Sequence, residues 1–403
     1  MTHSQSLAPA TGRALTAAAD AVRSRRDVLI GLSHSLHAEP ETALREFKSA
    51  AKIAAVLADA GFRVTDRAGG VPTALVGTYG TGDLVVALCA EYDALPGIGH
   101  ACGHNVNGAA AVGAALALAA VADDLALTVK LVGTPAEEDI GGKVLLLRAG
   151  VFDDVAAAMM VHAAPEDSVG ASSLAVGAWD VTYRGRPAHA ALAPWEGVNA
   201  LDAMTLAHTA VGLLRQQLPP GTLVHDIVLE AGHAVNVIPE LARGRYELRA
   251  HTVDDLAHAR QRVRACLEAG ALATGAALDL AEHGHDFADL RQDARLTAAY
   301  VRAARALGRD PVDRHGQRMA STDMGNVSHA VPSLHPTIGY DTQGAMQHTE
   351  QFARHGTSPG ADRAVLDGAI ALAHVAVELA TDPVGRQLFL DRVAARRGEA
   401  TTA

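Results

Sequence analysis

The sequence is poor in aromatic residues and in positive charge. Phe, Trp and Tyr together make up 3% of the 403 residues, and 34 Lys and Arg stand against 45 Asp and Glu, which gives a formal charge of −11. A negatively charged chain repels phosphate backbones, and scarce aromatic rings leave little surface on which bases can stack. These two deficits argue against a nucleic-acid partner.

Long hydrophobic runs and a disulfide framework are also missing. The longest apolar run, 108–122, is rich in Ala and Gly. It is shorter than the roughly 20 residues that cross a bilayer, so it predicts a buried helix. Residues 1–26 lack the apolar core of a signal sequence. Three cysteines, Cys89, Cys102 and Cys266, do not suggest a disulfide-stapled fold. We therefore expect a cytoplasmic protein with no membrane partner.

The order of predicted elements in the first part of the chain indicates an α/β fold. Helical periodicity covers 13–60 with a break near Pro40, and strand-like runs follow at 73–78, 84–89, 127–133 and 156–161, with helical patterns between the later ones. Such alternation is typical of a buried, mostly parallel sheet flanked by helices.

The middle of the chain predicts a different architecture. Strand, helix, strand, strand, helix and strand succeed one another within 175–282, which is the order of the ferredoxin-like α+β fold. A long helix is predicted again at 359–381, because Ser358 and Pro359 are typical of a helix start. We therefore expect a catalytic domain built from 1–175 and 289–403, interrupted by an inserted domain over 176–288.

The densest group of metal-binding residue types lies between a predicted strand and the predicted helix that follows it. Cys102 and His104 are separated by one glycine, so in an extended segment both side chains would face the same way. A thiolate and an imidazole suit a cation such as zinc, and the N-terminus of the helix would favour the thiolate. The amide of Asn105 is expected to cap that helix.

A dinucleotide-binding loop is the competing interpretation of the same segment. Gly97 and Gly99 precede the helix, as glycines do in such loops, but 91–96 separates them from the strand. Phosphate-binding glycines follow the strand directly, so the pattern favours a metal site.

Further ligand-type residues follow other predicted strands. Glu137 and Glu138 come after the strand at 127–133, His162 ends the apolar run 156–161, and His348 lies in a distant loop. Alone, paired acids are typical of a helix N-terminus, and a single histidine is more often structural. One carboxylate can instead bind a metal while its neighbour acts as a general base. With the cysteine and histidine above, these residues provide five ligand-type groups, enough for two metals and a water.

Eight motifs occur in the order found in one enzyme family. They are CAEYDALPGIGHACGHN (89–105), GTPAEE (133–138), GGKVLLLRAGVFDD (141–154), MMVH (159–162), GRPAHAALAPWEGVNALDA (185–203), NVIPE (236–240), STDMGNVSHAVPS (321–333) and HTEQF (348–352). On these motifs the sequence resembles the metallopeptidase-20 family, which includes aminoacylases and carboxypeptidase-G-like enzymes. The first motif and APWEG (193–197) are most similar to the amidohydrolase branch, near p-aminobenzoyl-glutamate hydrolases and β-alanyl-lysine-type dipeptidases.

The resemblance implies a metal-dependent enzyme that hydrolyses the amide bond of a small N-acyl amino acid or dipeptide. It implies two divalent ions per subunit, zinc or manganese, and Glu137 as the general base that acts on a metal-activated water. The implied metal ligands are Cys102, His104, Glu138, His162 and His348.

The resemblance also implies a homodimer formed through the inserted domain, which would act as a lid. His189 would stabilise the oxyanion, and Asn236 and Arg249 would hold the amide and the carboxylate of the substrate. Without the family pattern, His189 is interpreted as a surface-loop histidine and Arg249 as a solvated strand residue. A non-catalytic metal-dependent binding or regulatory subunit of the same fold is the alternative function.

Overall fold

The computed structural model describes residues 9–402, which fold into two units. Unit 1 contains the described residues up to Ser172, Leu290–Gln317 and those from Asn326 onward, and unit 2 contains Ser173–Asp289 and Arg318–Gly325. The short segment Arg318–Gly325 therefore folds with unit 2, although the sequence analysis assigned it to the second part of the catalytic domain.

Unit 1 contains most of the helices. They are α1 (Pro9–Ser24), α2 (Arg26–Ala38), α3 (Phe47–Asp59), η1 (Ala68–Gly70), α4 (His104–Ala119), α5 (Gly142–Arg148), α8 (Ala294–Ala306), α10 (Glu350–Arg354), α11 (Pro359–Thr381) and α12 (Pro383–Thr402), while α9 (Met324–Ala330) spans the boundary with unit 2. Its strands are β1 (Arg63–Asp66), β2 (Leu75–Tyr79), β3 (Leu84–Ala90), β4 (Leu127–Gly133), β5 (Ala157–Met159), β6 (His162–Ala164), β7 (Ser168–Val169), β12 (Val312–Asp313), β13 (Ser333–Leu334) and β14 (Thr337–Gly339).

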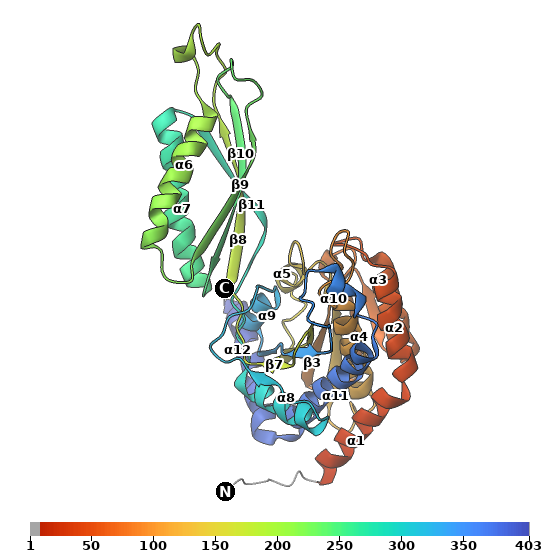
Figure 1. The fold of residues 1–403 in the computed structure, drawn as a ribbon. Helices are drawn as coiled ribbons and strands as arrows, with labels where there is room; N and C mark the ends of the chain where they lie inside the picture. The colour runs from red at the N-terminus through yellow and green to blue at the C-terminus, as the bar shows by residue number, and fades with distance from the viewer. Residues whose placement is uncertain (1–8, 403) are drawn as a thin grey trace. The chain divides into compact units, whose positions relative to one another are not determined.

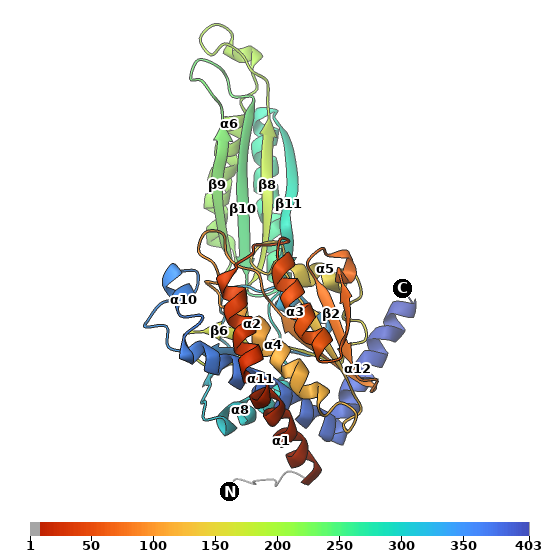
Figure 2. The same cartoon turned by 90° about the vertical axis from the view of Figure 1, so that its right-hand side faces the viewer.

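The main sheet of unit 1 has the strand order β1-β2-β4-β3-β5-β13, and a small second sheet has the order β12-β7-β14-β6. In the main sheet β4, β3, β5 and β13 run parallel, whereas β1 and β2 join as antiparallel strands at one edge. The parallel strands are almost continuously apolar because helices cover both of their faces (Figures 1 and 2). This confirms the predicted mostly parallel, helix-flanked architecture.

Two helices, α4 and α11, pack against each other in the core of unit 1. Nearly every residue of α4 is buried, as expected for a helix that is apolar all round. The predicted start and end of α11 are confirmed: Ser358 Oγ accepts a hydrogen bond from Ala361 N, and Pro359 opens the helix. In the described part of the chain, α11 alone is long and apolar enough to cross a membrane, and 67% of its apolar stretch is buried, as in a core helix.

Unit 2 contains one four-stranded antiparallel sheet and two long helices. Its elements are β8 (Ala175–Arg184), η2 (Pro194–Glu196), α6 (Ala200–Leu214), η3 (Arg215–Gln217), β9 (Leu223–Ala231), β10 (Leu241–Ala250), α7 (Val253–Thr274) and β11 (Ala277–Phe287). The strand order is β11-β8-β10-β9, and α6 and α7 cover one face (Figure 1). This is the predicted ferredoxin-like fold.

Candidate metal centre

The candidate ligands of unit 1 follow the carboxyl ends of neighbouring strands. Glu91 comes directly after β3, Glu137 and Glu138 follow β4, and His162 follows β5 as the first residue of β6. The carboxyl ends of parallel strands meet at one edge of a sheet, which is why segments distant in sequence converge there. His348 comes from the loop before α10, and its backbone N–H donates to Ala101 O at 3.0 Å.

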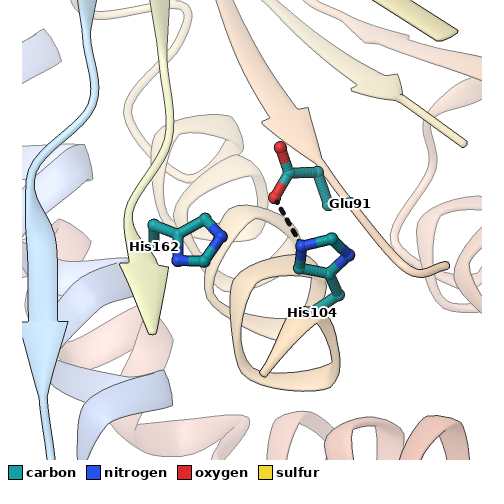
Figure 3. A group of neighbouring side chains, drawn as sticks. All are labelled: Glu91, His104 and His162. Carbon is teal, nitrogen blue, oxygen red and sulfur yellow. Dashed lines mark ion pairs between the residues drawn. The ribbon is translucent and has the colours of Figure 1, made fainter. Parts of the chain in front are cut away.

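The first cluster, here called the inner group, consists of Glu91, His104 and His162. Their potential ligand atoms lie within 4.8 Å of one another. Figure 3 shows the three side chains converging from β3, the start of α4 and β6. The side chains of Glu91 and His104 are 0% and 1% exposed, and Glu91 Oε2 lies 3.5 Å from His104 Nε2. Two of the three side chains of the inner group are therefore buried, whereas that of His162 is partly exposed.

The second cluster, the outer group, consists of Cys102, Glu138 and His348, whose ligand atoms also lie within 4.8 Å of one another. Glu138 Oε2 is 3.6 Å from His348 Nε2, and the side chain of His348 is 64% exposed. The other oxygen, Glu138 Oε1, lies 3.9 Å from His104 Nε2 in the inner group. The carboxylate of Glu138 thus stands between the two groups.

Glu137 forms a third cluster with His104 and Glu138, again within 4.8 Å, and is buried. The structure therefore brings together all six residues of unit 1 that the sequence analysis named: Cys102, His104, Glu137, Glu138, His162 and His348.

The local geometry predicted for Cys102 and His104 is wrong. The two residues do not lie in an extended segment, because Gly103 between them is left-handed, with φ 73°, and His104 is already the first residue of α4. A Cβ at Gly103 would come within 2.4 Å of Ala163 Cβ, so this turn requires glycine. The turn separates the two side chains, and each joins a different group.

The predicted helix cap is also wrong. Asn105 lies within α4, whose N-cap position is taken by Gly103 without a side-chain bond. The buried amide of Asn105 instead donates to Ser33 Oγ at 2.9 Å and to Gly356 O at 2.8 Å. Its role in the structure is to tie α4 to α2 and to the loop before α11.

Asp93 orients one residue of each group and was missed by the sequence analysis. Its Oδ1 lies 2.9 Å from His104 Nδ1, and its Oδ2 accepts a hydrogen bond from Glu138 N at 3.0 Å. Such a carboxylate fixes the tautomer and the direction of a ligating imidazole, which leaves His104 Nε2 for a ligand. The only sign of Asp93 in the sequence was its position two residues after Glu91, another acid, at the end of a predicted buried strand.

Glu91 was also missed, together with the residues that hold it. Lys143 Nζ donates to Glu91 Oε1 at 2.6 Å, and Asn107 Nδ2 donates to Glu91 Oε2 at 2.9 Å. Both charged side chains are 0% exposed. Burial alone would raise the pKa of Glu91, but the Lys143 ammonium lowers it. The signal in the sequence was a single lysine at the start of the apolar run GKVLLL.

The two imidazoles of the inner group have opposite electrostatic environments. Burial opposes the charge of His104, but the carboxylates of Asp93, Glu91 and Glu138 outweigh it and hold the pKa well above its usual value. Burial lowers the pKa of His162 to about 4, and the carboxylate of Glu91 opposes this shift only in part. In the metal-free protein His104 therefore carries a proton, whereas His162 is neutral.

The thiol of Cys102 does not behave as the sequence analysis expected. Burial raises its pKa, and the carboxylates of Glu138, Glu137 and Asp93 raise it further. The thiol is therefore protonated in the metal-free protein. A divalent cation reverses this preference, because a coordinating thiol loses its proton.

The arrangement fits divalent cations. Among the described residues, His104 Nε2 and Glu138 Oε1 are buried atoms without a hydrogen-bond partner, and they face each other across 3.9 Å. Two atoms that bind one zinc tetrahedrally lie about 3.4 Å apart, close to the separations found here. Soft sulfur, imidazole nitrogen and carboxylate oxygen are the donors that zinc and manganese accept.

The remaining predicted residues belong to unit 2 and lie at opposite ends of its sheet. His189 and Asn236 are exposed and lie beyond Arg184, the last residue of β8, in the loop after β8 and the loop before β10, which pair with each other and continue the β8–β10 ladder. Arg249 pairs with Val176 near the first residue of β8. Val176 and Arg184 are about 27 Å apart along an extended strand. One substrate molecule of the predicted size cannot touch both ends of one unit 2.

The guanidinium of Arg249 has partners within unit 2. Its Nε donates to Glu247 Oε1 at 2.8 Å, and an Nη donates to Ser321 Oγ at 3.2 Å. The side chain of Arg249 is 30% exposed, so part of it remains open to a ligand.

Comparison with known proteins identifies the family. Residues 87–376 match Peptidase family M20/M25/M40. The chain is 38% identical to the Xaa-Arg dipeptidase of Mus musculus over 74% of this chain and 71% of the relative. It is 35% identical to one of the p-aminobenzoyl-glutamate hydrolase chains of Escherichia coli (strain K12), over 63% of this chain and 57% of that protein.

Solved structures show the same fold at low sequence identity. A dinuclear metal-binding peptidase of the M20 family from Bacillus subtilis is 22% identical with a TM-score of 0.69, over 89% of this chain and 99% of that one. An aminobenzoyl-glutamate utilization protein from Klebsiella pneumoniae is 22% identical with a TM-score of 0.70, over 89% and 97%. The chain belongs to the peptidase family M20/M25/M40 and is a metal-dependent peptidase or amidohydrolase of small amides.

Proposed function

We propose that the protein hydrolyses the amide bond of a dipeptide or a small N-acyl amino acid, with two divalent cations, zinc or manganese, in each subunit. The observation that carries the proposal is the convergence of the inner and outer groups on the single carboxylate of Glu138. Cys102, His104, Glu138, His162 and His348 would hold the cations. Bound cations would supply a Lewis acid and lower the pKa of water to about 7.

Glu137 is the proposed general base. It is buried beside His104 and Glu138, so its carboxylate is near the site without belonging to either group. It accepts the proton of the attacking water and then delivers it to the nitrogen of the departing amine. The buried position keeps this proton from exchanging with bulk water between the two steps.

We propose that the active site is shared between two subunits. His189 would stabilise the oxyanion, Asn236 the substrate amide, and Arg249 the substrate carboxylate through its planar guanidinium. The separation of about 27 Å between the two ends of unit 2 supports sharing, because one subunit would supply Arg249 and the other His189 and Asn236.

The surface of unit 2 supports a homodimer through this unit. Strand β9 lies at one edge of its sheet, and Leu223, Ile227 and Leu229 on this strand are 44%, 57% and 52% exposed. An exposed apolar edge strand is a template for pairing with another strand. A second copy of the same edge would cover it as an antiparallel continuation of the sheet.

The proposal is tested by a hydrolysis assay with a panel of substrates. Metal-free protein is loaded with Zn²⁺ or Mn²⁺ and incubated with dipeptides that end in arginine or lysine, with p-aminobenzoyl-glutamate and with N-acetyl amino acids. Release of free amine that depends on the metal is expected, most of all from the dipeptides, given the similarity to Xaa-Arg dipeptidases. Thermal stabilisation by these compounds without any product would instead support the non-catalytic binding role.

Hybrid dimers test the shared site. His189→Ala and Glu137→Gln proteins are each expected to be inactive, but after subunit exchange a mixture regains activity, because a hybrid dimer contains one intact site. If activity does not return although mass spectrometry has verified the exchange, the site is not shared.

We also propose a cytoplasmic location, which fractionation of the source cells tests. None of the three cysteines forms a disulfide, which is consistent with a reducing compartment.

A further inference from the structure

We propose that Glu91 is an additional metal ligand of the inner group and that Lys143 is its positioning residue. The inference rests on the proposed function, because it requires a cation between His104 and His162. It adds to the five predicted ligands a residue that comes from the end of β3.

The carboxylate of Glu91 is oriented with one oxygen toward the site. Oε1 accepts the hydrogen bond from Lys143 Nζ at 2.6 Å, while Oε2 lies 3.5 Å from His104 Nε2. Since Asp93 engages His104 Nδ1, Nε2 is the ring nitrogen turned toward Glu91, and it has no hydrogen-bond partner among the described residues. Figure 3 shows His162 on the other side of the same space.

Asn107 links Glu91 to the segment that carries His162. Its Nδ2 donates to Glu91 Oε2 at 2.9 Å, and its Oδ1 accepts a hydrogen bond from Ala163 N at 2.8 Å. Within His162, Nδ1 faces Ala163 O at 2.9 Å, which leaves Nε2 for a ligand. One residue of α4 therefore fixes the acid and the second histidine relative to each other before any cation arrives.

The charges explain why Lys143 is needed. Buried carboxylates are costly unless they are paired, and Lys143, itself 0% exposed, compensates Glu91 in the metal-free protein. A divalent cation at Oε2 provides a second compensating charge, so that Lys143 and the cation share one carboxylate through different oxygens. Lys143 therefore stabilises the metal-free fold and, as a neighbouring positive charge, weakens cation binding.

The first test compares Glu91→Gln with wild type in Mn²⁺ titrations and in the visible spectrum of the Co²⁺-loaded protein. One of the two cations should bind at least about 100-fold more weakly. Loss of a residue that only hydrogen-bonds to a metal ligand lowers the metal affinity by about 10- to 100-fold, so a larger loss indicates a ligand. The Co²⁺ absorption should also change, since its intensity depends on coordination number. Asp167→Asn is the matched control, because Asp167, the residue before β7, pairs with Arg309 at 3.0 Å and belongs to neither ligand group.

The second test uses Lys143→Met. This variant should have a lower Tm than wild type without metal, and Mn²⁺ should raise its Tm by more degrees than it raises that of wild type. If Lys143 has only a structural role, the two metal-induced shifts will be equal. Should the single variant fail to fold, the double variant Glu91→Gln/Lys143→Met removes both buried charges and should bind Mn²⁺ as Glu91→Gln does.

Several outcomes overturn the proposal. The proposal is overturned if Glu91→Gln binds both cations with affinities within threefold of wild type. It is also overturned if the affinity falls while the Co²⁺ spectrum is unchanged, because Glu91 would then support the ligands without binding the cation itself. Equal metal-induced Tm shifts in Lys143→Met and wild type overturn the role of Lys143. If wild type itself binds no cation, the proposed function fails first, so the two failures are distinguishable.

Discussion

The inner and outer groups occupy the same edge of one sheet but differ in exposure and in charge. The inner group has two side chains that are at most 1% exposed and a paired Lys143 beside them, whereas the outer group includes His348 with 64% of its side chain exposed. A buried ligand set is pre-organised by its hydrogen bonds and exchanges slowly with solvent. An exposed set can admit water and substrate. We therefore expect the inner group to retain its cation and the outer group to admit the substrate.

The largest expected effect is the loss of activity on substitution of Glu137, which should leave cation binding by the inner and outer groups intact. Glu137→Gln should retain two cations and lose 10²- to 10⁴-fold in kcat, because an amide cannot take up the proton of the attacking water. Elemental analysis and steady-state kinetics on the same preparation measure both quantities. A loss of bound metal would show that Glu137 is a ligand, which would contradict its assignment as a base separate from the two ligand groups.

The next effect compares one histidine from each group. His162→Ala should weaken the binding of one cation by more than about 100-fold, since the other ligands of its group are buried and water reaches this position less readily than that of His348. His348→Ala should cost less, about 10- to 100-fold, because water can take its place at an exposed position. Competition with a chelator measures both affinities. Equal losses would show that exposure does not distinguish the two groups.

The smallest expected effect is on the pH dependence of stability, and it concerns Glu46, which binds the backbone next to Glu137 and Glu138. Glu46 is buried, accepts hydrogen bonds from Thr73 Oγ1 at 2.7 Å and Ala136 N at 2.9 Å, and burial raises its pKa to about 7. A pKa raised in the folded state contributes stability that is complete below the unfolded value and is lost as pH rises through the folded value. The metal-free protein should therefore lose at most about 3 kcal/mol between pH 4.5 and pH 7 through this group.

Glu46→Gln should remove this part of the pH dependence. Urea unfolding in EDTA at several pH values between 4.5 and 8 measures it, and the difference between wild type and variant should change with pH in that window. A constant difference would show that Glu46 is ionised throughout and that its bond to Ala136 acts without titration.

Much of the architecture could be predicted because local patterns carry it. Alternation of apolar strands and helices indicated the mostly parallel sheet, and the order of elements within 175–282 indicated the ferredoxin-like unit. The start of α11 followed from Ser358 and Pro359, whose capping and fixed φ act within one turn. The segment Arg318–Gly325 could not be assigned to unit 2 in this way, because its partners lie far away in sequence.

The candidate site could be predicted only as a set of residue types. Cys102 and His104 were expected side by side, yet the left-handed Gly103 sends them to different groups. The sequence did not predict the roles of Asp93, Glu91 and Lys143, because a single acid or lysine forms no repeating pattern or motif. Their importance depends on what is buried next to them. The roles of His189, Asn236 and Arg249 remain predictions, and the hybrid dimers test that of His189.

By itself the sequence determined the order of strands and helices, the family and the chemical types of the ligands, because these depend on neighbours within a few residues or on whole motifs. Only the tertiary structure decided which ligands pair with which, that Glu138 stands between the two groups, and that a buried lysine compensates Glu91. Those relations arise where strand ends distant in the chain meet. There burial makes every charge depend on partners that the linear order does not reveal.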